Sequence, residues 1–377
     1  MNREQVLKMF KEEIIPKESF KYFQKTYELC RDIREILVQS LLDGYIQLYK
    51  KINSTKKDPI CFINAELLRT GVYSREYDLL ISAYDKEWFF DKSPVYVSLN
   101  LKELFRYLDE FEEGMKLKVK RYVGAVSHVD VVVFKQEALE KYLHFITHIA
   151  REAVNRSIEG EAFKSLNRNE ILNFYSGEYK GKFSLIKRVD DSFKDEVKIR
   201  EEFESPDKDK RPEKDSSHSD FKGLNLKDMD FRFYNLSYSS FRGLKLTGSN
   251  LSGCSLCGCD FRESNLEEAT ITYSLICDGN FEGANLKKAR FKKSIGEITG
   301  PEFEKQYIMG LFGTNFKNAN LTETDFSECT LKGSDFRGGI FNNTIFKDAD
   351  LKDAKFDRLN KWSLKLSTDQ INSIEWV

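Results

Sequence analysis

The second half of the chain repeats with a period of five residues. Fifteen successive positions at this spacing, from Phe221 to Phe291, are all Phe, Leu or Ile, and nine more follow from Phe316 to Phe356. In most repeats a small residue lies two positions before the large one, as Ala284 does before Leu286. Helices space their apolar residues by three and four, and strands by two. A period of five predicts instead a coil with one turn per repeat, in which the large and small residues point inward together.

A longer period of twenty residues lies within this pattern. Residues twenty apart are the same in two series, Phe221, Phe241, Phe261 and Phe281, and Leu226, Leu246, Leu266 and Leu286. Four repeats are therefore expected to form one coil, so that equivalent side chains stack in columns on four faces. With a rise of about 4.8 Å per coil, the repeats predict about six coils and a rod about 29 Å long.

The repeat resembles the motif of the pentapeptide-repeat family. That motif has five positions. The first is a small residue, the second is polar, the third is Leu or Phe, and the last two are variable and polar. The stretches Gly283–Lys287 and Asn318–Thr322 carry it, and the resemblance covers about residues 221–356. It implies a right-handed quadrilateral β-helix with a dry core. The segment Leu366–Ile371 is similar to the short helix that closes such rods, and a bare last coil needs a cap of this kind.

The repeats are interrupted between Phe291 and Phe316, a distance of 25 residues that keeps the phase. Leu311 is in phase to supply the one missing large residue, so that about residues 292–310 are expected to loop out of one face. Glycines and a proline punctuate this segment, and residues 301–309 predict a short helical turn. The candidate partner-binding residues of the loop are Glu302, Phe303, Glu304, Tyr307 and Met309.

Residues 1–187 have different periodicities and predict a mixed α+β domain of unknown role. Helices are expected over 17–53, 101–111 and 136–158. Strands are expected over 61–68, 77–84 and 95–99, with a strand pair around Gly124 within 116–134. Trp88, Phe89 and Phe90 are interpreted as core residues rather than a ligand platform. This part of the chain resembles no family.

Between the two domains, residues 188–220 are charged and poor in aromatic residues. Such a composition cannot bury a core, so a flexible linker is expected there. The formal net charge of the chain is −1, which gives no overall attraction to nucleic acid or an acidic membrane. The coil segment 221–356 itself holds 18 Lys and Arg and 18 Asp and Glu residues.

The composition indicates a cytoplasmic protein without a membrane segment. The N-terminus is charged and lacks the apolar run of a signal peptide, and no stretch approaches the roughly 18–20 apolar residues that span a bilayer. The seven cysteines do not have the spacing of a small disulfide-bonded domain, so thiols are expected in a reducing compartment.

Few residues form a pattern of catalytic or metal-binding chemistry. His144, His148 and Glu152 are spaced for one helix face, but a polar helix edge is favoured over a metal site. In Cys254-Ser-Leu-Cys257-Gly-Cys259, the first and third cysteines fall on the small inward position. Cys257 is expected to face outward and to stack on Cys277 as a surface thiol pair. No nucleotide-binding or nucleophile motif is present, so no enzyme, metal or cofactor is expected.

The family resemblance implies a binding role. The similar bacterial members bind type II topoisomerases, DNA gyrase or topoisomerase IV, as mimics of duplex DNA and so protect them from antibiotics or toxins. Mimicry needs rows of carboxylates, because duplex DNA carries one negative charge per about 1.7 Å. The balanced charge of this coil and the large N-terminal domain depart from that pattern. The alternative is a scaffold whose two domains bind separate protein partners, and neither hypothesis requires direct binding of nucleic acid.

The C-terminal residues allow two interpretations. Trp362, Ile371, Ile374 and Trp376 form an apolar tail. The tail serves either to cap its own coil or to form a homodimer through the C-terminal end. The sequence does not choose between them.

Overall fold

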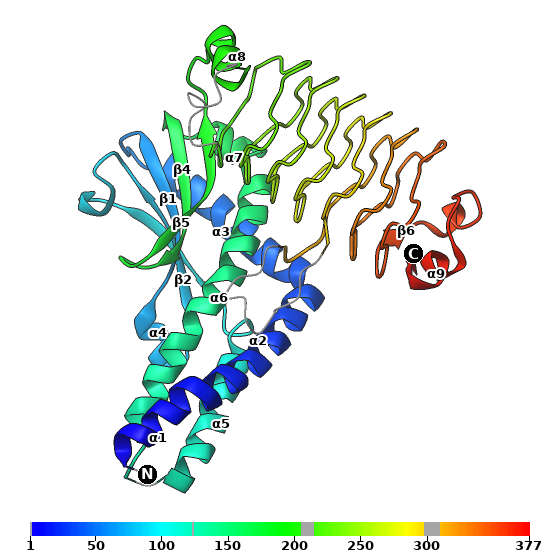
Figure 1. Cartoon of the computed structure of the whole chain (residues 1–377). Helices are drawn as coiled ribbons and strands as arrows, with labels where there is room; N and C mark the ends of the chain where they lie inside the picture. Colours follow the sequence, from blue (N-terminus) through cyan, green and yellow to red (C-terminus); the bar gives the residue numbers. More distant parts are fainter. Residues whose placement is uncertain (1, 123, 205–214, 298–309) are drawn as a thin grey trace. The chain divides into compact units, whose positions relative to one another are not determined.

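The computed structural model describes residues 2–122, 124–204, 215–297 and 310–377 (Figure 1). The chain forms two compact units that divide between Arg188 and Val189. The first unit is an α+β domain, as predicted, and the second contains the coil.

The first unit combines a bundle of helices with one sheet. The helices are α1 (Arg3–Met9), α2 (Ile15–Asp32), α3 (Arg34–Asn53), α4 (Arg69–Ser74), α5 (Arg106–Val119), α6 (His128–Ser157) and α7 (Glu161–Lys164). The strands are β1 (Ile60–Leu67), β2 (Asp78–Tyr84), β3 (Val95–Asn100), β4 (Arg168–Glu178) and β5 (Phe183–Asp190). They form a sheet in the order β3-β2-β1-β4-β5, in which β1 pairs antiparallel with β2 and parallel with β4.

One face of the sheet packs on helices. Phe174 of β4 contacts Tyr45 of α3, with ring centroids 6.2 Å apart. A Cβ atom at Gly44 of α3 would lie only 2.7 Å from Leu99 of β3. A side chain at this position would therefore require the ends of Leu99 and Ile81 to move.

Two predictions for the first unit differ from the structure. The expected single helix over 17–53 is broken at Ile33 (φ −105°, ψ 19°), which separates α2 from α3. The strand pair predicted over 116–134 is wrong, because these residues end α5 and begin α6. Helix α6 starts with a capping box. The Ser127 side chain accepts a hydrogen bond from the Asp130 backbone amide, and the Asp130 carboxylate accepts one from the Ser127 backbone amide. Strands β4 and β5 were not predicted.

The second unit is a β-helix built from short parallel bridges. The bridges join residues twenty apart, from Asp215 with Asn235 onward, and residues 35 apart across the insertion, as between Asn280 and Asn315. The predicted phenylalanine column is confirmed: the rings of Phe241, Phe261 and Phe281 stack with centroids 4.7 Å apart. All three side chains are fully buried, so the period of five places them in the core.

The linker prediction over 188–220 is wrong for the described residues. Residues 188–190 belong to β5, residues 196–204 form helix α8 (Glu196–Glu204), and the first coil bridge begins at Asp215. Phe203 of α8 is buried against Phe231 and Tyr234, with ring centroids 4.9 and 4.8 Å away. Phe203 thus packs this charged helix on the first coil, and Arg200 of the same helix donates to the backbone carbonyls of Asn225 and Lys227. Residues 205–214 lie outside the described part.

The chain after the last repeat folds back on the coil. Helix α9 (Thr368–Ser373) starts at Ser367 with a capping box, and β7 (Glu375–Trp376) pairs in parallel with β6 (Lys355–Phe356). The Gln370 side chain donates to the backbone carbonyls of Phe346 and Ala349, at 2.8 Å each. These bonds use carbonyls of the last coil that have no further coil to pair with.

Candidate partner-binding site

The insertion in the coil is shorter than predicted. Residues 292–297 continue the coil, since Ile295 bridges both Leu275 and Thr330. Gly296 occupies the missing large position, where a Cβ atom would lie 2.4 Å from Thr314 Oγ1 and 2.8 Å from Ile276 Cγ1. The prediction that Leu311 fills this position is therefore wrong. The five candidate loop residues, Glu302, Phe303, Glu304, Tyr307 and Met309, lie outside the described residues.

Side chains of the coil hold both ends of the insertion. The Asp278 carboxylate accepts from the backbone amides of Leu311 at 3.0 Å and Phe312 at 2.7 Å. Glu297 forms an ion pair with Lys332 at 3.0 Å, and this contact raises the pKa of Lys332. The points where the chain leaves and rejoins the coil are thus fixed on one face.

Carboxylates on the coil surface lie beside cations. Asp335 binds Arg337 at 2.6 Å and Lys317 at 3.4 Å, and Glu328 binds Lys292 at 3.0 Å. The same arrangement recurs in the pairs Asp260–Arg262, Glu267–Lys287 and Glu268–Lys288. Each of these carboxylates is neutralised locally, which is unlike the unbalanced charge of a DNA backbone.

Two exposed aromatic residues on the coil were missed in the sequence. Phe233 and Tyr273 are 63% and 64% exposed and have φ values of 67° and 57°. Bulky residues seldom adopt this left-handed conformation, and Gly occupies it more readily. The Phe233 ring lies over Gly253, where a Cβ atom would be 2.6 Å from the ring. The sequence feature that could have identified these two residues is an aromatic side chain at a repeat position that elsewhere is mostly small or polar.

The cysteines of the coil are only partly as predicted. Cys254 and Cys259 point inward, and their thiols donate to the carbonyls of Phe231 at 2.8 Å and Leu236 at 3.0 Å. Cys257 and Cys277 do lie together, since the hydrogen bond between their thiols lowers the pKa of Cys257 and raises that of Cys277. The predicted surface location is wrong, because Cys257 is 6% and Cys277 0% exposed. A Cβ atom at Gly310 would lie 2.8 Å from Cys277 Cβ, so the end of the insertion packs on this cysteine. All seven cysteines are free thiols.

The residues of the C-terminal tail separate into two groups. Ile374 is buried, and Trp376 is half-buried against Phe356, with ring centroids 5.8 Å apart. Ile371 is also half-buried, and its carbonyl accepts from Trp376 Nε1 at 2.9 Å. Trp362, in contrast, is 83% exposed.

The helix face with His144, His148 and Glu152 forms ion pairs. Glu152 accepts from Arg34 at 2.8 Å and from Arg156 at 2.6 Å. Burial lowers the pKa of His144, and neighbouring His148 adds to this effect. Within the described residues, no group of three or more His, Cys, Asp or Glu side chains is arranged to hold a metal ion.

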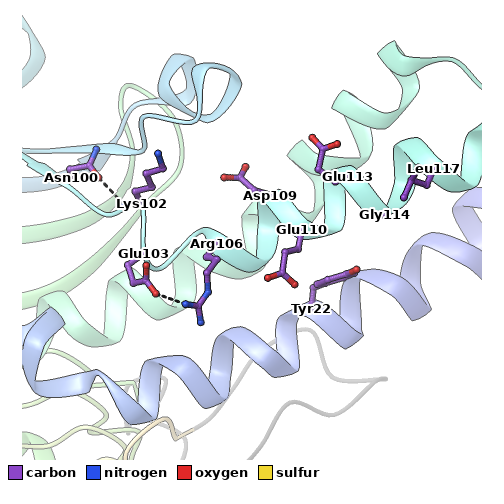
Figure 2. Close-up of a pocket in the computed structure, with 10 residues that line it drawn as sticks. All are labelled: Tyr22, Asn100, Lys102, Glu103, Arg106, Asp109, Glu110, Glu113, Gly114 and Leu117. Atoms are coloured by element: carbon purple, nitrogen blue, oxygen red, sulfur yellow. Dashed lines mark hydrogen bonds and ion pairs between the residues drawn. The ribbon is translucent and has the colours of Figure 1, made fainter.

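A groove of about 910 Å³ lies in the first unit along α5. Figure 2 shows its side chains spread along this helix, with Tyr22 of α2 on the other side. Its carboxylates are engaged: Glu110 binds Lys25 at 3.3 Å, and Glu103 binds Arg106 at 2.8 Å. The groove therefore presents charges already paired by neighbours. Among the described helices, none has the length and apolarity needed to cross a membrane.

Comparisons with known proteins agree with the coil. The family model for pentapeptide repeats matches eight copies, in residues 217–253, 239–272, 311–348 and 327–358. A search of curated proteins finds no match.

A search of solved structures finds pentapeptide-repeat proteins of low overall similarity. QnrB1, a plasmid-mediated fluoroquinolone resistance protein, is 20% identical over 36% of this chain and 66% of its own, with a TM-score of 0.22. HetL, from the cyanobacterium Nostoc, is 18% identical over 37% of this chain and 75% of its own, with a TM-score of 0.16. Rfr23, from the cyanobacterium Cyanothece, is 18% identical over 44% and 93%, with a TM-score of 0.16.

This chain spans about two thirds of QnrB1, and these similarities say nothing of what it binds. The repeats themselves imply a right-handed β-helix. The matched repeats, the bridges at twenty-residue spacing and the buried columns show that the second unit contains a pentapeptide-repeat coil, which a separate α+β domain precedes in the chain.

Proposed function

We propose that the chain is a non-enzymatic binding protein, a scaffold whose coil and α+β domain bind separate protein partners. The observation that carries this proposal is the fixed base of the insertion. Asp278 and the Glu297–Lys332 pair hold both of its ends on one face of a rigid coil. The backbone at these attachment points does not have to be ordered when a partner binds, which favours recognition.

The surface of the coil supports a protein partner. Phe233 and Tyr273 expose aromatic rings on a surface where the named charges are paired. Aromatic anchors surrounded by polar groups are typical of protein–protein interfaces. Both residues occupy a repeat position that is left-handed in most coils, so the turn itself projects their rings outward.

The second candidate is a DNA mimic that binds DNA gyrase or topoisomerase IV and gives antibiotic resistance or self-immunity. The family resemblance and the insertion in the coil support it. Against it stand the carboxylates of Asp335, Glu328 and Asp260, each within 3.0 Å of a cation. Their negative charge is not available to replace phosphates.

A supercoiling assay separates the two candidates. Gyrase and a quinolone are mixed with increasing amounts of the full chain, and supercoiling and cleaved DNA are measured. The scaffold proposal expects unchanged sensitivity to the quinolone. Protection that is lost in Asp278→Ala, but kept in Asp348→Ala at a comparable exposed turn, would establish the DNA mimic instead.

We further propose that α8 and the C-terminal segment close the two ends of the coil. Phe203 covers the first coil, and Gln370 and Ile374 cover the last. A homodimer through exposed Trp362 remains the alternative use of the C-terminal end. Light scattering of the full chain and of Trp362→Ala distinguishes the cap from the homodimer. A dimer that dissociates in the variant would show that Trp362 lies in the dimer contact. The buried free thiols fit the proposed cytoplasmic location.

A further inference from the structure

The last coil of the second unit has an open backbone edge on two of its four faces. In the inner coils the amide of each large residue donates to the next coil, as Phe326 does to the carbonyl of Ile345 at 2.8 Å. Phe341 and Phe346 occupy the same repeat position in the last coil, which no further coil follows. Among the described residues, neither of their amides has a hydrogen-bond partner, and the same holds for the carbonyl of Thr344.

The C-terminal segment closes the other two faces. The strand β7 extends the ladder, since the Glu375 amide donates to the carbonyl of Ala354 at 2.9 Å and Glu375 pairs in register with Lys355, twenty residues earlier. The Asp353 amide donates to the carbonyl of Ser373 at 2.8 Å. Figure 1 shows α9 at this end of the coil. The edge that stays unpaired is therefore a defined stretch of the last coil, and not its whole circumference.

Apolar side chains are exposed along the unpaired edge. Ile340 and Ile345 are 53% and 45% exposed, and they bridge the polar residues Asn320 and Asp325 of the preceding coil. Phe341 is only partly buried, although the large residues of the inner coils are enclosed. An unpaired edge with exposed β-branched side chains and no proline is a template for pairing with a further strand.

A groove runs beside this edge. It has a volume of about 750 Å³ and is lined by residues 343–350 of the last coil and by Lys365, Ser367, Asp369 and Gln370 of the segment that follows. This volume lies within the range of sites that enclose a ligand. Because part of the lining belongs to the C-terminal segment, a single extended strand fits beside the edge more readily than the broad end of a second coil.

The pairing of charges along the coil indicates what such a strand would carry. Successive coils place opposite charges side by side, as Glu268 and Lys288 do at 3.3 Å. The strand β7 follows the same rule, because Glu375 lies 3.8 Å from Lys355 of the last coil. A strand added to another face is therefore selected by the charges beside which it lies.

Two charged residues of the groove are available for this selection. Lys347 and Asp348 line the groove, and both side chains are exposed. Within the described part of the chain, neither forms an ion pair. An acidic residue beside the lysine and a basic residue beside the aspartate would continue the alternation of charge from coil to coil.

We propose that this edge binds an extended segment of a protein partner, which adds one parallel strand to the coil. The residue beside Ile345 is β-branched. Its amide donates to the Thr344 carbonyl, and its carbonyl accepts from the Phe346 amide. An acidic residue two positions later pairs with Lys347, and a basic residue follows beside Asp348. Main-chain bonds supply the affinity and the side chains the choice of partner.

The proposal rests on the scaffold function and adds a docking site apart from the insertion. The test uses the full chain and the fluorescein-labelled peptide Ser-Thr-Val-Thr-Glu-Lys-Ser, with fluorescence anisotropy as the readout. We expect a Kd below about 1 mM. Methylation of the valine amide removes the hydrogen bond to Thr344 and is expected to weaken binding by about tenfold. Methylation of the next threonine changes an amide that faces away from the edge, and should leave the affinity within about twofold.

Matched variants test the side chains. Exchange of the glutamate and the lysine in the peptide is expected to weaken binding by about threefold, because like charges then meet at Lys347 and Asp348. Ile345→Thr should also weaken binding by about threefold. Ile295→Thr changes the same repeat position in an inner coil, at a residue that is 38% exposed, and should have no effect. Asp278→Ala should leave the peptide affinity unchanged, which separates this site from the insertion.

Three results would overturn the proposal. The first is the absence of binding by the unmodified peptide up to about 1 mM. The second is equal binding of the peptide that is methylated at valine, because the main-chain bond would then be absent. The third is a homodimer that light scattering detects in the full chain and that dissociates in Ile345→Lys, since a second copy would then occupy the edge.

Discussion

Glycine positions show how single residues shape the coil. Gly253 and Gly283 both turn the chain with positive φ, 69° and 67° respectively. They differ in what surrounds them: a Cβ atom would lie 2.6 Å from the Phe233 ring at Gly253, but 3.9 Å from Glu263 at Gly283. At Gly253, both the positive φ and the Phe233 ring disfavour a side chain. At Gly283, only the positive φ does.

We predict that Gly253→Ala lowers the free energy of unfolding by about 2–4 kcal/mol and Gly283→Ala by about 1–2 kcal/mol. Both variants lose stability because alanine must adopt the left-handed conformation, and only Gly253→Ala must also displace an aromatic ring. Chemical denaturation of the two variants measures the difference. Equal losses would show that the Phe233 ring moves away without cost.

Asp278 acts at the same scale. Asp278→Ala removes the acceptor of two backbone amides, which is expected to cost about 1–3 kcal/mol locally and to speed hydrogen exchange at Leu311 and Phe312. Asp348 has nearly the same φ, 57° against 56°, and its side chain is exposed. Asp348→Ala therefore controls for the backbone conformation and should leave exchange at both amides unchanged.

Helix α8 shows how a short element closes a repeating structure. Each coil covers its neighbours, but the first and last coils expose apolar surface unless another element covers them. Phe203 is the residue of α8 that enters the core of the coil, whereas Val197 on the same helix is 66% exposed. Ile199 packs against the same core from a partly buried position, so Phe203 supplies the fully buried part of a wider contact.

Phe203→Ala is expected to destabilise the second unit by about 3–5 kcal/mol, as for a buried aromatic residue. Val197→Ala is the matched control and should change stability by less than about 0.5 kcal/mol. Thermal unfolding measures both. Faster exchange confined to the first coil in Phe203→Ala would locate the loss at that end.

At the scale of the whole molecule, the two units are stabilised differently. The second is built on stacked apolar columns, while the first buries charges. Lys135 is 4% exposed, and it donates to Asp109 and Glu112 at 2.8 Å each. Despite burial, which acts in the other direction, the contacts with Lys116 and Lys135 lower the pKa of Glu112 to about 2.

Acid should therefore weaken the first unit through Glu112. Because its folded pKa lies below the usual value of 4.5, its contribution is complete above that pH and is lost as the pH falls from about 4.5 to 2. In a variant in which Trp362 and Trp376 are replaced by Phe, the fluorescence of Trp88 reports on this unit. In Glu112→Gln the dependence of stability on pH should become shallower in this range, and an unchanged slope would contradict the assignment.

The sequence by itself determined the coil. The large residues at the fifth position have nearly the same environment, so local pattern and final burial coincide, as Phe241, Phe261 and Phe281 show, and among the described repeats only Phe341 is partly exposed. The α+β character of the first unit also followed from periodicity. The spacing of apolar residues indicates only which side of the chain faces the core. In a repeating coil, each repeat contacts only its neighbours, so this spacing is nearly sufficient to define the fold.

Tertiary structure decided what the period does not record. Trp88 stacks on Phe62 because β1 and η2 (Trp88–Phe90), which are separate in sequence, lie together on one sheet face. Gly296 rather than Leu311 continues the coil, and Phe203 joins the core of the second unit from a charged segment. Each of these depends on contacts between distant residues, whose geometry is set by packing and not by the local alternation of polar and apolar side chains.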